Sequence, residues 1–255
     1  GPGLQWPGSA AWDVLEGSRV LTTKAIYEIG GMPPGGGVPE RMHAALIRQE
    51  RFGPPSKAFQ LEEVPVPRIK DTQVLVHMMA CGVNYNNIWA GMGRPIDVIA
   101  MRKKRGEPED YHIGGSEGSG VITAIGEGVT DLQVGQRVAT GGDFGTCAEM
   151  IAVNAGRLIP LPGGIDSRLA CAVLMQGRTA HYLSRDAYPI QEGDKVLIHA
   201  GAGGVGSLLI QMAKRAGAFV FTTVSTDAKA DFAREQGADH VINYSHEDFA
   251  EVILE

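Results

Sequence analysis

Three glycines spaced as Gly201-x-Gly203-x-x-Gly206 point most directly to chemistry in this sequence. The residues before them, 195–199, form a short apolar run typical of a strand, and residues 205–216 after them have helical periodicity. In a strand–turn–helix of this kind the first glycine permits the tight turn, the second lets the backbone approach a pyrophosphate, and the third allows close helix–strand packing. The helix N-terminus adds N–H groups and the positive end of its dipole. We therefore predict that a dinucleotide binds to Gly201, Ala202, Gly203, Gly204, Val205 and Gly206.

The end of the next expected strand, at residues 219–224, indicates which dinucleotide binds. Proteins that bind NAD usually place a carboxylate there to accept a hydrogen bond from the ribose 2′-hydroxyl. Here Ser225 and Thr226 follow the strand, and Lys229 lies one turn into the next helix. Hydroxyls and an ammonium group suit a 2′-phosphate, which a carboxylate would repel. These residues predict NADPH as the cofactor, and the nearby Asp227 leaves NADH as the alternative.

The elements that must position these residues alternate along residues 195–254. Strands are expected at 195–199, 219–224 and 241–243, and helices at 205–216, 228–236 and 247–254. This β-α-β-α-β-α order is typical of a doubly wound parallel sheet, which in its complete form has two such halves. One or two helices are expected at 167–184. We thus expect residues 166–255 to form the first half of a Rossmann domain, so that the domain looks truncated.

The preceding part of the chain has a different pattern. Short strands bounded by glycine, proline or turn signals are expected at 43–49, 59–64, 72–79, 119–125, 137–140 and 147–153. Their spacing favours a compact, mostly antiparallel, barrel-like domain over residues 42–165. Residues 1–41 are rich in glycine and proline and are interpreted as an extension or linker with one short helix or strand around residues 18–29. The fold class is therefore α/β, with a mostly-β domain before the Rossmann part.

Composition limits the partners. The formal net charge of −6 gives no reason to expect nucleic acid. No apolar run reaches the length of a membrane span, and the N-terminus lacks the pattern of an export signal. Three widely spaced cysteines do not suggest a disulfide framework. These observations favour the cytoplasm, with a small molecule as the partner.

Several motifs in their order resemble the quinone oxidoreductase branch of the medium-chain dehydrogenase/reductase superfamily. They are the glycine turn with its flanking segments, Gly114-Gly-Ser-Glu117-Gly-Ser-Gly, Gln176-Gly-Arg-Thr179-Ala, and the run from Glu235 to Tyr244. The resemblance implies a GroES-like catalytic domain before the Rossmann domain and an active site in the cleft between them. It assigns the 2′-phosphate to Ser225, Lys229 and Tyr244, and it adds Thr179 to the cofactor site.

The same resemblance argues against zinc. Zinc-dependent relatives carry a cysteine within the segment that matches residues 82–86, and Gly-His-Glu where this chain has Gly115-Ser116-Glu117. Here the corresponding positions are Asn84 and Ser116, so no tetrahedral metal site is expected. Cys81 and Cys171 stand among apolar residues and are expected to be buried core residues.

A second resemblance involves residues 83–89, whose Asn84-Tyr85-Asn86 and Trp89 are similar to the crotonyl-CoA carboxylase/reductase group and to enoyl-CoA reductase domains of propionyl-CoA synthases. It implies hydride transfer from NADPH to an α,β-unsaturated CoA thioester, with Asn84, Tyr85 and Asn86 bordering the site. Each of the three is equally well interpreted as a residue supporting a loop. Asn86 matches an asparagine that helps hold CO2 in carboxylating relatives, but the Phe-Glu region is shortened here to residues 141–145, which leaves carboxylation open.

An insertion at residues 94–112 carries the basic cluster Arg102-Lys103-Lys104-Arg105, which either attracts CoA phosphates or is simply solvated. Three functions are consistent with these features. The first is an NADPH-dependent enoyl-CoA reductase, and the second is an NADPH-dependent quinone or enal reductase. The third is a non-catalytic fragment of a larger oxidoreductase or multienzyme, whose partners would be neighbouring domains; a homo-oligomer is a further alternative.

Overall fold

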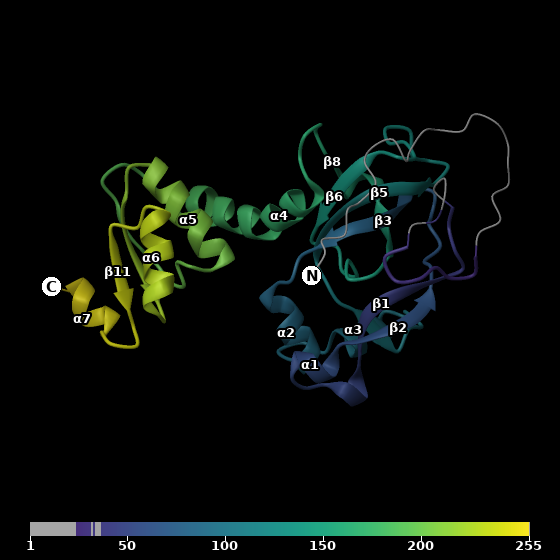
Figure 1. The fold of residues 1–255 in the computed structure, drawn as a ribbon, viewed down its shortest axis with the longest axis horizontal. Helices are drawn as coiled ribbons and strands as arrows, with labels where there is room; N and C mark the ends of the chain where they lie inside the picture. The colour runs from purple at the N-terminus through teal and green to yellow at the C-terminus, as the bar shows by residue number, and fades with distance from the viewer. Residues whose placement is uncertain (1–23, 32, 34–36, 255) are drawn as a thin grey trace. The chain divides into compact units, whose positions relative to one another are not determined.

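The computed structural model describes residues 24–31, 33 and 37–254 (Figure 1). The chain divides into two compact units, of which the first ends at Ala172 and the second begins at Val173. The helix or strand expected around residues 18–29 is not found in its described part, because residues 24–29 form bends and turns; the remainder of that expectation lies outside the described residues.

A five-stranded antiparallel sheet, ordered β7-β3-β5-β6-β8, forms the larger part of the first unit. One face of this sheet covers a core that includes Val74, Val76, Ile122 and Val138. Consecutive residues of β3 and β5 are buried, so the other face of these strands is covered as well. The strands are β3 (Gln73–Cys81), β5 (Glu117–Ile125), β6 (Arg137–Gly141), β7 (Met150–Asn154) and β8 (Ile159–Pro160). This is the mostly antiparallel domain that the sequence predicts.

A second, three-stranded sheet has the order β2-β1-β4. It consists of β1 (Arg41–Arg48), β2 (Gln60–Pro65) and β4 (Tyr111–Ile113). Met42, Leu46 and Val64 of this sheet share a core with Leu75 and Met150 of the five-stranded sheet. The two sheets are therefore held together by apolar packing.

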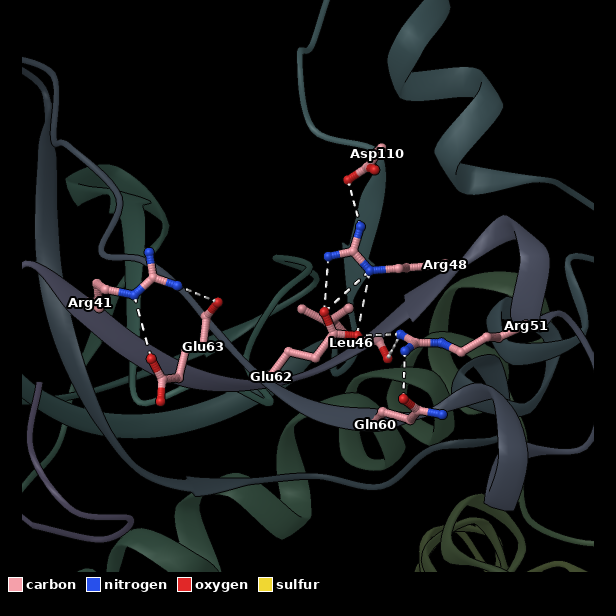
Figure 2. A network of polar contacts seen from close by, with 8 residues as sticks. All are labelled: Arg41, Leu46, Arg48, Arg51, Gln60, Glu62, Glu63 and Asp110. Carbon is pink, nitrogen blue, oxygen red and sulfur yellow. Dashed lines mark hydrogen bonds and ion pairs between the residues drawn. The ribbon is translucent and has the colours of Figure 1, made fainter.

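A network of ion pairs and hydrogen bonds connects the three strands of this sheet (Figure 2). Arg48 of β1 contacts the carboxylate of Glu62 on β2 at 2.9 Å and that of Asp110, just before β4, at 2.8 Å. Arg51 reaches the same Glu62 carboxylate at 2.6 Å. The expected insertion at 94–112 is thus tied at its end to the sheet.

Short helices in the first unit were not expected from the sequence. They are α1 (Pro55–Ala58), α2 (Tyr85–Met92) and α3 (Val98–Lys104), with single 3-10 turns η3 (Gln49–Arg51) and η4 (Ala155–Arg157). The side chain of Asp97 caps α3 by accepting from Ala100 N at 2.9 Å. Gly93, with φ of 64°, ends α2 in the left-handed conformation. Local caps therefore define helices too short for a periodic pattern to indicate.

The second unit is a parallel sheet ordered β11-β10-β9. Its strands are β9 (Lys195–Ile198), β10 (Phe219–Val224) and β11 (His240–Asn243), and its helices are α5 (Gly204–Arg215), α6 (Asp227–Glu235) and α7 (Phe249–Leu254). Ile210 and Ala213 of α5 and Ala233 of α6 pack on Ile198 and Val220 of the sheet. The strand order, third-second-first, is that of one half of a doubly wound fold.

Helix α4 (Ser167–His181) runs from the first unit into the second and continues into a π-helical turn, η5 (Tyr182–Ala187). None of the helices that the structure describes combines the length and apolar character needed to cross a membrane.

Candidate functional site

The turn between β9 and α5 contains the glycine motif. Gly203, in an extended conformation, is the N-cap of α5, and its N–H donates to Ala200 O at 2.8 Å. The N–H of Gly201 donates to Thr223 O at 3.1 Å, which ties the turn to β10. The left-handed residue of this turn is Ala200, with φ of 54°.

The glycines are required here by close contacts. A Cβ on Gly201 would collide with the hydroxyl of Thr222 and lie 3.0 Å from Ile210 Cδ1. A Cβ on Gly206 would lie 2.9 Å from Gly201 Cα. Gly201 makes room for Thr222 in the turn, whereas the positive φ belongs to Ala200. The prediction of close packing at Gly206 agrees with these distances.

Gly203 and Gly204 are exposed at the start of α5, whereas Ala202 and Val205 are partly buried. A Cβ on Gly203 would meet only Ala200 O, at 3.1 Å, so its outer side is open. The first-turn N–H groups of an α-helix have no acceptor within the helix. These features together give an exposed backbone with donors and a positive dipole end, which fits a phosphate group.

Thr179, which the family resemblance adds to the cofactor site, lies on helix α4 and not in the glycine turn. Its hydroxyl donates to Met175 O of its own helix at 2.7 Å. One turn earlier on α4, Gln176 lies beside the turn, because a Cβ on Gly204 would be 2.7 Å from Gln176 Cγ. The residue of α4 that borders the turn is therefore Gln176, which the sequence analysis did not select.

Beyond β10, hydroxyl groups and one cation lie together. Lys229 Nζ donates to Ser225 Oγ at 3.0 Å, and Thr226 Oγ1 caps α6 by accepting from Lys229 N at 3.4 Å. Asp227 accepts from Asn243 Nδ2 at 2.9 Å, so this carboxylate, which the sequence leaves as an argument for NADH, already has a partner. The nearby β11 ends in Asn243.

Tyr244 follows β11 and is 56% exposed, and its N–H donates to Val224 O at 3.1 Å. Ser245 Oγ donates to Ser225 O at 3.0 Å and joins the same cluster. A cavity of about 650 Å³ lies at the carboxyl ends of β9 and β10. Its lining residues are His199, Ala200, Thr223, Tyr244, His246, Glu247, Asp248 and Phe249. The structure thus brings all the residues predicted for the 2′-phosphate to one edge of the sheet.

In the first unit, the predicted Asn84–Asn86 segment begins α2. Asn84 Nδ2 donates to Oε1 of Glu117 at 2.6 Å, and Glu117 is fully buried at the start of β5. A Cβ on Gly82 would lie 2.6 Å from Glu117 Cδ, so only glycine leaves room for this carboxylate. The pair Asn84–Glu117 thus connects the start of α2 to the β-sheet.

Asn86 and Asn87 make a second connection, between α2 and the residues just before β5. Asn86 Nδ2 donates to Ser116 Oγ at 2.8 Å, and Asn87 Oδ1 accepts from Gly115 N at 3.0 Å. Asn86 Oδ1 is buried without a hydrogen-bond partner in the described structure, so it is an acceptor ready for a donor. Ser116, Glu117 and Asn87 were not selected from the sequence, because their roles appear only when β5 is next to α2.

Tyr85 points outward. Its side chain is 66% exposed, and it packs edge to face on Trp89 with ring centroids 5.4 Å apart. Among the three predicted catalytic residues, two therefore hold the helix start and one faces solvent.

Asn84 and Ser116 occupy the positions of the zinc ligands of zinc-dependent relatives, and both take part in the hydrogen bonds just described. Asn84 binds Glu117 and Asn86 binds Ser116. Over the described residues, no three His, Cys, Asp or Glu side chains form a group that could hold a metal.

One expectation is corrected by the structure. Cys81 was predicted to be buried with Cys171; Cys171 is buried, but Cys81 is exposed because it is the last residue of β3. The basic cluster Arg102–Arg105, which the sequence interprets either as attracting CoA phosphates or as simply solvated, is exposed except at Arg102. Arg102 is engaged by Glu107 at 2.5 Å and Glu109 at 3.4 Å, so at most part of the cluster is available to an anion.

Two family models match the chain. The alcohol dehydrogenase GroES-like domain matches residues 70–163, and the zinc-binding dehydrogenase family matches residues 204–255. The chain is 35% identical over 250 residues to a crotonyl-CoA carboxylase/reductase of Cereibacter sphaeroides, covering 86% of this chain and 57% of the relative.

Two solved structures are similar in fold. A crotonyl-CoA carboxylase/reductase, AntE in complex with NADP, has a TM-score of 0.77 at 36% identity, covering 89% of this chain and 63% of that one. The Escherichia coli quinone oxidoreductase complexed with NADPH has a TM-score of 0.72 at 29% identity, covering 83% and 60%. The chain thus spans less than two thirds of the length of these relatives.

A GroES-like antiparallel β unit followed by a Rossmann-like parallel sheet defines the class of protein, and confirms the predicted α/β fold. The chain belongs to the medium-chain dehydrogenase/reductase superfamily, as the sequence motifs indicate.

Proposed function

We propose that this chain binds NADPH at the turn between β9 and α5. The observation that carries the proposal is the cluster of Ser225 and Lys229, whose polar atoms lie 3.0 Å apart beyond β10. An ammonium group and hydroxyls match a 2′-phosphate, and the exposed Gly203–Gly204 backbone matches the pyrophosphate. The contact of Asp227 with Asn243 favours NADPH over NADH, because that hydrogen bond already occupies one oxygen of the carboxylate.

We further propose the reaction class. The protein of which this chain is part reduces the C=C bond of an α,β-unsaturated acyl-CoA thioester. The support is the similarity to crotonyl-CoA carboxylase/reductases, together with the Asn84–Trp89 segment. NADPH, when bound, supplies a hydride. The chain's own residues then position the acyl group and donate hydrogen bonds to the thioester oxygen, on which negative charge develops.

In this proposal the three residues of the Asn84–Asn86 segment have different roles. Asn84 and Asn86 hold the start of α2 on β5 through Glu117 and Ser116, and so fix the direction of Tyr85. The exposed Tyr85 hydroxyl donates to the thioester oxygen. The unpartnered Asn86 Oδ1 accepts from an N–H or O–H group of the substrate or of an ordered water.

The domains follow from these roles. We propose residues 42–165 as the substrate-side catalytic domain, residues 166–255 as the NADPH-binding part, and residues 1–41 as an extension. Further partners are neighbouring domains of a larger multienzyme or a second copy of the chain.

The experiment is calorimetric titration of the 255-residue chain with NADPH and, in parallel, with NADH, followed by addition of crotonyl-CoA and measurement of NADPH absorbance. Selective NADPH binding with oxidation on crotonyl-CoA addition is the expected result. Equal affinity for both cofactors would refute the role of Ser225 and Lys229. Absence of any binding would favour the non-catalytic fragment.

A second candidate is an NADPH-dependent quinone or enal reductase, favoured by the structural similarity to the NADPH-bound quinone oxidoreductase of Escherichia coli. The two functions differ in their use of the CoA group. Free coenzyme A should compete with crotonyl-CoA in the first function and should not affect turnover of a benzoquinone in the second. Turnover with a quinone and none with crotonyl-CoA would replace the first candidate by the second.

A further inference from the structure

The three cysteines of the chain are far apart in sequence but surround one stretch of backbone, Gly114–Gly118. Cys81, at the end of β3, is the register partner of Gly118 in β5. The N–H of Cys147 donates to Gly114 O at 2.9 Å. Cys171 Sγ lies 3.9 Å from Glu117 O. The start of β5 therefore brings all three thiols into one region.

Two of these thiols are in direct contact. Cys147 donates a hydrogen bond from its thiol to the sulfur of Cys81. The backbone agrees with this placement, because a Cβ on Gly118, the strand partner of Cys81, would lie 3.3 Å from Cβ of Thr146, the neighbour of Cys147. A Cβ on Gly115 would lie 2.8 Å from Cys147 Sγ, so glycine at this position leaves the space that the Cys147 side chain occupies.

The contact gives the two thiols different reactivities. The hydrogen bond from Cys147 lowers the pKa of Cys81 to about 7, although burial acts in the opposite direction. The same hydrogen bond and burial raise the pKa of Cys147. Near neutral pH a large fraction of Cys81 is thus the thiolate, which is the nucleophilic form, and the residue is exposed to solvent.

We propose that Cys81 and Cys147 form a peroxide-sensitive thiol pair, with Cys81 as the residue that is oxidised and Cys147 as the residue that resolves it into a disulfide. The chemical class of the reactant is a small hydroperoxide such as hydrogen peroxide. This site lies within the first unit and does not depend on the proposed reductase activity.

Both steps balance. The Cys81 thiolate attacks one oxygen of the peroxide; an S–O bond forms, the O–O bond breaks, and the hydroxide that leaves takes up a proton as water. Cys147 sulfur then attacks Cys81 sulfur; an S–S bond forms, the S–O bond breaks, and the hydroxyl leaves as water with the thiol proton of Cys147. Two electrons pass from the two thiols to the peroxide. Once Cys81 is oxidised, the thiolate that raised the pKa of Cys147 no longer exists, so Cys147 becomes easier to deprotonate.

Cys171 is the internal comparison. It is buried, and burial raises its pKa to about 12, so little thiolate is present at neutral pH. Proximity to the same backbone stretch therefore does not make every thiol of the cluster reactive. The proposal predicts that Cys171 remains reduced while the other two react.

The experiment treats the reduced 255-residue chain with graded hydrogen peroxide, with and without dimedone, and maps peptides by mass spectrometry without reduction. The expected product is a peptide pair linked through Cys81 and Cys147, with the mass of two hydrogens lost. Cys171→Ala should give the same product. Cys147→Ala and Cys147→Ser should each stop at a dimedone adduct on Cys81, and Cys81→Ala should leave Cys147 unmodified.

The two Cys147 variants also separate the hydrogen bond from the disulfide. In the unsubstituted chain, the rate of alkylation of Cys81 by iodoacetamide should rise with a midpoint near pH 7. A serine hydroxyl still donates a hydrogen bond, so Cys147→Ser should keep a low midpoint, whereas Cys147→Ala should shift it upward. A disulfide that includes Cys171, a disulfide between two chains, or persistence of the sulfenic form at Cys81 in the unsubstituted chain would each overturn the proposal.

Discussion

Lys229 Nζ donates a hydrogen bond to Ser225 Oγ at 3.0 Å, which places a cation and a hydroxyl side by side beyond the end of β10. Because a 2′-phosphate would bind both groups, Lys229→Ala should weaken NADPH binding about tenfold, the usual effect of one lost charged hydrogen bond. NADH, which lacks this phosphate, should bind as before. Calorimetric titration with both cofactors measures the difference.

The matched control is Lys195→Ala, which removes the same charge at the opposite, amino end of β9. It should change neither affinity. If both lysine variants weaken NADPH binding equally, then general electrostatic attraction, and not a specific phosphate contact, explains the effect.

Gly206→Ala should reduce the stability of the protein, whereas Gly203→Ala should reduce its affinity for NADPH. The Cβ of Gly206→Ala would be forced against Ala200 and lie 2.9 Å from Gly201 Cα, so this variant should lose about 2 kcal/mol of stability through overpacking. Gly203→Ala meets only Ala200 O at 3.1 Å and should fold nearly normally, but its methyl group would stand where a pyrophosphate approaches. Thermal unfolding together with NADPH titration separates the two effects. Normal NADPH affinity in the folded Gly203→Ala variant would contradict the proposed phosphate position.

Asn84→Asp tests the contact between α2 and β5. The substitution preserves shape but places a second carboxylate 2.6 Å from Glu117 Oε1, which is fully buried. Loss of the donor and repulsion between like charges should cost about 3 kcal/mol. Denaturant unfolding measures it, with Asn154→Asp on the surface at the end of β7 as the control. Unchanged stability of Asn84→Asp would show that the contact does not hold the helix.

His112 should make the first unit sensitive to acid. Burial, with a contribution from the charge of Arg102, lowers the pKa of His112 from 6.5 to about 4. Because the folded pKa is the lower one, the unfolded chain binds the proton first; the stability contributed by the neutral ring is complete above pH 6.5 and is lost as the pH falls towards 4. The linked loss is about 3 kcal/mol at most.

The measurement is the free energy of unfolding at a series of pH values between 7 and 4 for the unsubstituted chain and for His112→Phe. The variant should have a flatter profile. His181→Phe, which replaces an exposed histidine, should reproduce the original profile, and a steep profile in His112→Phe would assign the acid sensitivity to other groups.

Glu62 and Glu63 form a matched pair in the network of Figure 2. Glu62 is bound by Arg48 at 2.9 Å and by Arg51 at 2.6 Å with its side chain 25% exposed, and the hydrogen bond from Arg48 lowers its pKa. Glu63 contacts Arg41 at 3.5 Å and is 53% exposed. Glu62→Gln should therefore cost about 1 kcal/mol and Glu63→Gln close to nothing. The cost of Glu62→Gln should diminish as the pH falls below 4.5, where the unfolded chain takes up a proton at Glu62, and should vanish below the lowered pKa of the folded carboxylate. Equal costs for both variants would refute the role of the network.

The sequence predicted the second unit well because its signals are local. The strand expected at residues 219–224 has the bounds of β10, and the glycine turn lies where the motif places it. Apolar runs between helices of clear periodicity leave few alternatives for a parallel sheet. The motif does not say which residue of the turn adopts a positive φ; in the structure that residue is Ala200.

The first unit was harder to predict in detail. Helix α2 depends on hydrogen bonds from Asn84 and Asn86 to Glu117 and Ser116, about thirty residues away, so no local pattern indicates it. Cys81 was misplaced for a similar reason: its apolar neighbours suggest burial, whereas its position at the end of β3 exposes it. Side-chain contacts between distant segments decide both.

The position of Thr222 links the glycine turn to the interior of the sheet. Its hydroxyl donates to Ile198 O at 2.6 Å. The same hydroxyl lies against Gly201, so a side chain of the neighbouring strand β10 packs directly on the turn. The turn cannot change shape without disturbing the hydrogen bonds between β9 and β10. Occupancy of the turn should therefore slow amide hydrogen exchange along both strands together, so that the turn and the two strands open as one cooperative unit.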